Sequence, residues 1–275
     1  MKAIAKALSQ AARQLGPASD TARLDAELLM AEALHIERDR LLLSPPDRAL
    51  PKRFWTMVDR RQAGEPVAYI TGRRAFWNIE LHVGPGVLIP RPDSEVLIAS
   101  AIEHFDGTGG PKGILDLGTG PGTLLLAALD LWPAATGLGI DSSRRALSYA
   151  QANARRLELE DRVTFELGNW DGGVSGKFDL ILCNPPYVAT SAELGPGVAE
   201  FEPPEALFAG PEGLDDFRRL APAFPRLLGK RGLAAVEIGA GQASSAAELL
   251  AINGLEARIA EDLANRPRAV LLSWA

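Results

Sequence analysis

The chain has 275 residues, 47% of them apolar, and a formal net charge of −6 at pH 7. Its apolar residues fall in short runs, none near the ~18 residues that a membrane span needs, so the composition predicts a soluble globular protein without a membrane segment. Basic residues form no long stripe, which argues against a stable nucleic-acid partner held by phosphate contacts.

The cysteine and histidine content points away from disulfide and metal chemistry. Cys183 has no partner for an internal disulfide and lies inside an apolar run, so we expect a buried, inert thiol and a reducing, cytoplasmic setting. His35, His82 and His104 are scattered without the spacing of metal ligands, and no metal site is predicted.

Residues 1–65 are predicted to form a small helical domain. A first helix is indicated by apolar residues at helical spacing, namely Ile4, Ala7, Leu8, Ala11 and Leu15. A second helix is expected after Asp20 and another before Gly64. In the second helix, the face expected to be buried carries Leu24, Leu28, Ala31 and Leu34.

Residues 66–90 are predicted to be a hairpin that links two domains. The extended patterns at residues 75–83 and 86–89 are separated by Gly84-Pro85-Gly86, a strong turn signal. Asp93 then stands where an N-cap is expected, for a helix that begins near Ser94.

Residues 91–275 alternate between strand and helix patterns. Strand-like runs at residues 113–117, 136–140, 163–167, 179–183 and 233–238 are separated by helical patterns, which predicts an α/β domain with a doubly wound, mostly parallel sheet. The tail offers two more strand-like runs joined by a short loop, so an antiparallel hairpin is expected at one edge of the sheet.

A glycine-rich turn joins the first of these strands to a helix beginning at about Thr123. Gly118, Gly120 and Gly122 permit positive φ angles and let a ligand approach the backbone. Nineteen residues past Gly122 the next strand ends on Asp141, whose carboxylate can accept hydrogen bonds from two ribose hydroxyls. The pair predicts an adenosine-type cofactor, although such a turn also occurs as plain strand-to-helix geometry.

The spacing of the glycines separates two cofactor classes. A nicotinamide site expects a third glycine where Thr123 stands, whereas the G-x-G-x-G pattern after Asp116 resembles the first motif of S-adenosylmethionine-dependent methyltransferases. After the third strand, Trp170 follows Asn169 where the adenine would lie in such a fold. A packing aromatic is an equally good interpretation of Trp170.

The fourth strand-like run ends in Asn184-Pro185-Pro186-Tyr187. The prolines fix their own φ angles and hold the preceding residues extended, so the corner is stiff and its carbonyl groups are free to accept. The side-chain oxygen of Asn184 and the carbonyl of Pro185 can accept both hydrogens of a substrate NH2, while Tyr187 packs on its planar group. The alternative is a pair of prolines that merely ends a strand.

The combination of motifs resembles the HemK/PrmC family of glutamine methyltransferases. N-P-P-Y alone is shared with adenine-specific DNA and guanine-specific ribosomal RNA methyltransferases. The residues 88–95, LIPRPDSE, resemble the family's I-P-R-P-E-T-E element, and FEPPEALFAGPEGLDDFRRL resembles its E-P-x-x-A-L…G-x-x-G-L segment. The departures are Asp93 and Ser94 in place of Glu and Thr, and Asn169 in place of an aspartate.

The resemblance implies a class I methyltransferase fold with a seven-stranded sheet at residues 91–275, a recognition role for residues 1–65, and S-adenosyl-L-methionine as cofactor. The implied reaction methylates the side-chain amide nitrogen of the glutamine in the GGQ motif of class I peptide-chain release factors. By motif match, the implied cofactor positions are Gly118, Thr119, Gly120, Pro121, Gly122, Asp141, Trp170 and Asn184. The implied glutamine positions are Asn184, Pro185, Pro186 and Tyr187, of which Asn184, Pro185 and Tyr187 are the catalytic ones.

Other interpretations stay open beside this one. They are methylation of a glutamine in a large-subunit ribosomal protein, methylation of a nucleic-acid base, and a module that binds the cofactor without catalysis. The acidic balance and the missing target-recognition domain weigh against the second, and the intact Asn184 corner weighs against the third. We also expect a monomer. Phe76 and Arg91 are placed near the pocket, with core packing for Phe76 and a surface ion pair for Arg91 as alternatives.

Overall fold

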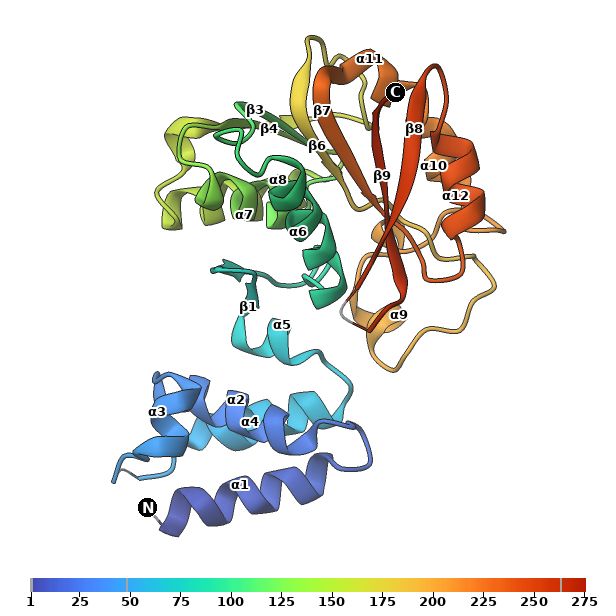
Figure 1. Ribbon diagram of the computed structural model, residues 1–275. Helices are drawn as coiled ribbons and strands as arrows, with labels where there is room; N and C mark the ends of the chain where they lie inside the picture. Colours follow the sequence, from blue (N-terminus) through green and yellow to red (C-terminus); the bar gives the residue numbers. More distant parts are fainter. Residues whose placement is uncertain (1, 48, 263) are drawn as a thin grey trace. The chain divides into compact units, whose positions relative to one another are not determined.

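The computed structural model describes residues 2–47, 49–262 and 264–275. The chain divides into two compact units, the first made of Met1–Arg73, Val83–Pro85 and Leu194–Glu202, the second of Arg74–His82, Gly86–Glu193 and Pro203–Ala275. Figure 1 traces both along the chain. The recognition role predicted for residues 1–65 stays a prediction.

The first unit is a helical bundle. Its helices are α1 (Lys2–Leu15), α2 (Ala22–Leu34), α3 (Arg38–Leu43), α4 (Lys52–Gln62), α5 (Val67–Thr71) and the short α9 (Val198–Phe201). All five apolar residues predicted on the inner face of α1 are buried, as helical periodicity requires.

The buried face predicted for α2 is wrong at Leu24, which is 40% exposed. The helix packs against α1, α3, α4 and α5, so its buried surface wraps around much of its circumference and includes Leu29 and Met30. Even Asp25 and Glu27 are buried there, because Arg61 pairs with Asp25 and Arg38 pairs with Glu27. Periodicity along one helix does not show how many neighbours will cover it.

The hairpin predicted between residues 66 and 90 has a different geometry. Residues 67–71 form α5, and the two-stranded sheet pairs β1 (Arg73–Phe76) with β2 (Ile79–His82). The turn therefore lies at Trp77 and Asn78, and the expected strand at 86–89 does not form. Trp77 adopts a positive φ of 52°, which is uncommon for a bulky residue and could not be predicted from the residue type. Its backbone amide donates to Glu95 Oε1 at 3.1 Å.

The second unit contains the predicted doubly wound sheet. Its strands are β3 (Gly113–Leu117), β4 (Thr136–Asp141), β5 (Val163–Leu167), β6 (Phe178–Cys183), β7 (Leu228–Glu237), β8 (Leu255–Glu261) and β9 (Pro267–Trp274). They form one seven-stranded sheet in the order β5-β4-β3-β6-β7-β9-β8. The first five strands in this order are parallel, and β9 runs antiparallel to both β7 and β8. The predicted fold class and the edge hairpin are confirmed.

Helices cover both sides of this sheet (Figure 1). They are α6 (Glu95–His104), α7 (Thr123–Leu131), α8 (Arg144–Arg156), α10 (Asp215–Leu220), α11 (Ala223–Leu227) and α12 (Ala243–Leu250). A large core joins the inner residues of the strands to Phe217, Phe224 and Leu250. Cys183 belongs to it, and burial raises the pKa of its thiol, which confirms the expectation of a buried residue.

The predicted N-cap at Asp93 is wrong. Residues Pro92–Ser94 form a single 3-10 turn, and α6 begins at Glu95 without a side-chain cap. The carboxylate of Asp93 instead pairs with Arg268, whose Nη2 lies 2.8 Å from Oδ2. An ion pair with a residue on β9 takes the place of the local cap.

No helix in the part of the chain that the structure describes is long and apolar enough to cross a membrane.

Candidate active site

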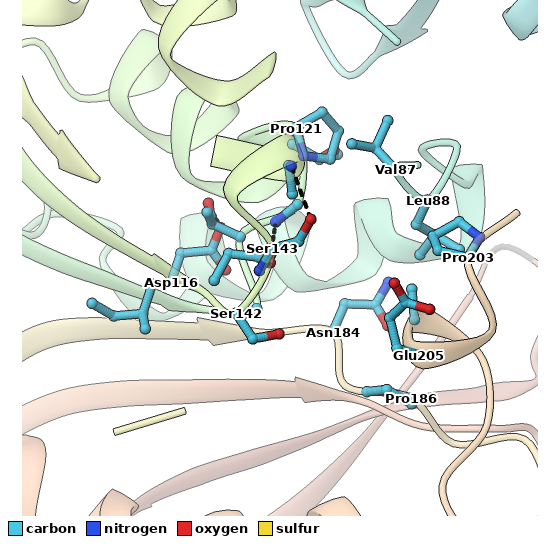
Figure 2. Close-up of a pocket in the computed structure, with 18 of the residues that line it drawn as sticks. Val87, Leu88, Asp116, Pro121, Ser142, Ser143, Asn184, Pro186, Pro203 and Glu205 are labelled. Carbon is cyan, nitrogen blue, oxygen red and sulfur yellow. Dashed lines mark hydrogen bonds between the residues drawn. The ribbon is translucent and has the colours of Figure 1, made fainter. Parts of the chain in front are cut away.

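A pocket lies within the second unit, at the carboxyl ends of β3, β4, β5 and β6 (Figure 2). Strand order reverses between β3 and β6, because later strands are added on opposite sides of β3. Loops separate at such a switch point and leave a crevice where ligands bind in doubly wound sheets. The fold therefore places the pocket where the strand pattern predicts it.

The glycine turn after β3 forms one wall. Gly118, Gly120 and Gly122 all have positive φ angles, between 57° and 88°, as the turn was expected to require. The amides of Gly118 and Thr119 both donate to the carbonyl of Ile140 at 2.9 Å, which ties the turn to β4. A Cβ on Gly118 would lie 3.0 Å from the ring of Trp170, so a side chain there would press on the indole. Helix α7 begins at Thr123, as predicted.

Asp141 faces the pocket from the end of β4. Its Oδ2 accepts from the amide of Gly120 and its Oδ1 from the amide of Ser143, both at 2.8 Å. Burial raises the pKa of Asp141, and these two hydrogen bonds oppose that shift. Each carboxylate oxygen keeps a second lone pair, so the fixed carboxylate can still accept from a ligand.

Asp116 is a second acidic residue of the pocket, on β3 beneath the turn. The hydroxyl of Thr119 donates to its Oδ2 at 2.7 Å, while Oδ1 makes no hydrogen bond with the described residues. Burial raises the pKa of Asp116 to about 7, against the lowering effect of the Thr119 hydrogen bond. A buried acceptor with unused capacity suits a ligand that carries a donor group.

Trp170 lines the pocket and also packs against the hydrophobic core, which agrees with its packing alternative, while the adenine contact stays a prediction. Its Nε1 donates to Asp216 Oδ1 at 3.2 Å, and its φ of 53° is unusual for an aromatic residue. Asn169 lines the same wall. The indole is therefore fixed in orientation by a hydrogen bond on the side of α10.

The Asn184 corner follows β6 directly. Asn184 and Pro186 line the pocket, whereas Pro185 and Tyr187 lie next to it without lining it. The Nδ2 of Asn184 donates to Ser94 Oγ at 3.2 Å, and the Tyr187 hydroxyl donates to Glu237 Oε1 at 3.0 Å. Figure 2 shows Asn184 and Pro186 with Glu205, a pocket residue of the segment after α9.

The segment that follows the corner holds it in place. The amide of Val188 donates to Leu207 and the amide of Ala209 donates to Val188, both at 2.9 Å. The carbonyl of Tyr187 accepts from Gln242 Nε2 at 3.0 Å, and the same nitrogen donates to the carbonyl of Gly213 at 3.2 Å. The stiffness expected from two prolines is thus reinforced by tertiary hydrogen bonds.

The remaining residues predicted for the site fall into two groups. Gly120, Pro121 and Arg91 line the pocket, so the expected position of Arg91 near the pocket is confirmed. Gly122 is the N-cap of α7 and lies against Leu126. Phe76 is 2% exposed and does not line the pocket, which favours its packing alternative.

Sequence reasoning missed Ser94, Glu237 and Gln242 as neighbours of the corner. The available signal at Ser94 is that it stands where the family pattern has threonine. Glu237 is a charged residue at the end of the apolar run 233–238, and that contrast was the available signal. Gln242 carries no such signal.

Comparison with known proteins identifies the family. The PrmC N-terminal domain family matches residues 6–72, and a methyltransferase domain family matches residues 111–218. A release factor glutamine methyltransferase of Rhodospirillum rubrum is 43% identical over 255 residues, which cover 90% of this chain and 78% of that protein. The chain belongs to the release factor glutamine methyltransferase family.

Further relatives agree with this family. The release factor glutamine methyltransferase of Caulobacter vibrioides is 40% identical over 92% of this chain and 89% of its own. A methyltransferase structure from Pyrococcus furiosus matches with a TM-score of 0.52 at 18% identity, over 78% of this chain and 96% of that one, and shows the shared fold. The resemblance to the HemK/PrmC family and the assignment as a methyltransferase enzyme are both confirmed.

Proposed function

We propose that this protein transfers a methyl group from S-adenosyl-L-methionine to the side-chain amide nitrogen of the glutamine in the GGQ motif of class I release factors. The observation that carries the proposal is one pocket bordered by the glycine turn, Asp141 and Asn184, in a chain of this family. Release factors are accordingly its proposed partners, and we propose that it acts as a cytoplasmic monomer.

The pocket residues fit such a cofactor. Gly118 has no side chain that would press on the Trp170 indole, and in our proposal the adenine ring lies near that indole. Asp141 would accept from the ribose hydroxyls, and Asp116 offers a buried acceptor with unused capacity near the turn amides. When bound, S-adenosylmethionine supplies an electrophilic methyl group on a sulfonium centre.

The Asn184 corner addresses the weak nucleophilicity of an amide nitrogen. The lone pair of such a nitrogen is delocalised into the carbonyl group, so its direction must be imposed. In our proposal, Asn184 Oδ1 and the Pro185 carbonyl accept the two N–H hydrogens, and the lone pair then points along a fixed direction. Positioning of this kind can supply of order 7–11 kcal/mol. The nitrogen becomes positively charged as it is methylated and loses a proton readily, so the proposal needs no dedicated base.

The position of the label tests the proposal. The protein is incubated with methyl-labelled S-adenosylmethionine and, separately, with purified release factors, ribosomal proteins, DNA and RNA, and the label is located by mass spectrometry. We expect it on the GGQ glutamine, and a release factor with that glutamine replaced by alanine should remain unlabelled. Label on adenine, guanine or a ribosomal protein instead would contradict the proposal.

Replacing Asp141 with alanine is expected to weaken cofactor binding by about 1–3 kcal/mol, because the ribose loses a charged hydrogen-bond acceptor. Isothermal titration calorimetry with S-adenosylhomocysteine measures the change, and thermal unfolding checks that the glycine turn survives. Asp130→Ala is the matched control, since Asp130 is exposed near the C-terminal end of α7, whereas the glycine turn precedes the N-terminal end of that helix. If Asp141→Ala and the control bind S-adenosylhomocysteine equally well, Asp141 does not contact the ribose.

A further inference from the structure

Four side chains near the pocket form a continuous hydrogen-bonded series, in the order Asn184, Ser94, Glu237, Tyr187. Asn184 Nδ2 donates to Ser94 Oγ at 3.2 Å, and the Ser94 hydroxyl donates to the carboxylate of Glu237. The Tyr187 hydroxyl donates to Oε1 of the same carboxylate at 3.0 Å. The series joins both polar side chains of the corner to the end of β7 and to the turn before α6.

The centre of the series is shielded from water. Ser94 is 2% exposed and Glu237 is 1% exposed, and Glu237 lies outside the pocket lining. Taking a carboxylate out of water is costly unless hydrogen bonds compensate it. Burial raises the pKa of Glu237 to about 7, while the hydrogen bonds from Ser94 and Tyr187 lower it. Its other oxygen, Oε2, has no hydrogen-bond partner among the described residues.

The series has a direction, which Glu237 sets. A carboxylate oxygen can only accept, and protonation at the unpartnered Oε2 would leave Oε1 an acceptor. Ser94 has a single hydroxyl hydrogen, which it gives to Glu237, so towards Asn184 its oxygen can only accept. The side-chain amide of Asn184 therefore turns Nδ2 towards Ser94 and leaves Oδ1 on its other side.

We propose that Ser94 and Glu237 are positioning residues, which hold the Asn184 amide so that its oxygen, rather than its NH2 group, meets the substrate. This inference rests on the function proposed above. A reversed amide would present two N–H donors to a substrate that itself offers N–H donors, and the two groups would repel each other. Glu237 also holds Tyr187, so one buried carboxylate orients both polar side chains of the corner.

A pair of variants of equal shape tests the role of the hydroxyl. Ser94→Thr and Ser94→Val both add a methyl group at a buried position, but only threonine keeps the hydroxyl. We expect the single-turnover rate of methyl transfer to a release factor to fall at least about tenfold in Ser94→Val, and Ser94→Thr to recover most of it. Binding of S-adenosylhomocysteine should be unchanged in both. Ser100→Ala, which removes a buried hydroxyl of α6 outside the pocket, should keep the wild-type rate.

A substrate that offers acceptors instead of donors distinguishes a lost orientation of the Asn184 amide from a general loosening of the site. A release factor whose GGQ glutamine is replaced by glutamate presents only acceptors. We expect this factor to inhibit the wild-type enzyme weakly and Ser94→Val several-fold more strongly, because a freed Asn184 can turn its NH2 group to the carboxylate. A variant that is merely loosened would bind both release factors less well.

The outcomes distinguish the two proposals. If the wild-type enzyme methylates no release-factor glutamine, the proposed function fails. If the wild-type enzyme does methylate that glutamine, but Ser94→Val and Ser94→Thr have the same methyl-transfer rate and are inhibited equally by the glutamate-containing release factor, the positioning role is wrong. The proposed function then still stands. Glu237→Gln keeps an acceptor oxygen and Glu237→Leu removes it, so a rate in Glu237→Leu as high as in Glu237→Gln would likewise overturn the role of Glu237.

Discussion

Asn184→Ala should lower the rate of methyl transfer by orders of magnitude while leaving the fold and S-adenosylmethionine binding largely intact. The side chain lines the pocket at the end of β6 and provides one of the two acceptors proposed for the substrate NH2. Misplacing a reacting atom by about 1 Å can cost on the order of a hundredfold in rate. Single-turnover assays with labelled cofactor measure the rate, and calorimetry with S-adenosylhomocysteine measures binding.

Asn184→Asp is the sharper variant at the same position. A carboxylate keeps an acceptor for the substrate but loses the N–H donor to Ser94 and adds a negative charge near the sulfonium. We expect partial activity with weakened selectivity for glutamine. Wild-type single-turnover rates in both variants would show that Asn184 only ends a strand.

Gly213→Ala is expected to reduce both stability and activity. Gly213 has a φ of 71°, and a Cβ there would lie 2.3 Å from the carbonyl oxygen of Tyr187 and 2.9 Å from Gln242 Nε2. The Tyr187 carbonyl is backbone, so it cannot yield without moving the Asn184 corner, and Gln242 can yield only by giving up its hydrogen bond to that carbonyl. A positive φ costs an alanine about 1–3 kcal/mol, and the clash adds to it.

Gly173→Ala separates the two effects. Gly173 has a φ of 88°, and an added Cβ would meet nothing within 4 Å, so this variant suffers the backbone strain without the clash. Denaturant unfolding should show a larger loss of unfolding free energy for Gly213→Ala, and only Gly213→Ala should lose methyl-transfer rate, by about a hundredfold for a shift of about 1 Å. Equal losses of stability with an unchanged rate would mean that the Gly213 contact does not position the corner.

The sequence alone determined the parallel sheet and the residues at its carboxyl edge. The strands that carry the site, β3, β4 and β6, are short and mostly apolar. The glycine turn follows β3 directly, Asp141 ends β4, and the Asn184 corner follows β6 directly. Because parallel strands bring their carboxyl ends to one edge, local patterns were enough to predict that these residues meet. The turn glycines were predictable for the same reason, since the positive φ angles belong to a local conformation.

Tertiary structure decided what depends on distant neighbours. The buried face of α2 is set by four other helices, and Asp93 pairs with Arg268 instead of capping the helix beside it. The hairpin turn lies at Trp77, where the Glu95 carboxylate accepts the backbone amide, although Gly84-Pro85-Gly86 carries the stronger local signal. Ser94 and Glu237 reach Asn184 and Tyr187 only because β7 pairs with β6 and α6 packs against β7. Such contacts produce no periodic pattern in the sequence. They join residues that are far apart along the chain and become neighbours only in the folded structure.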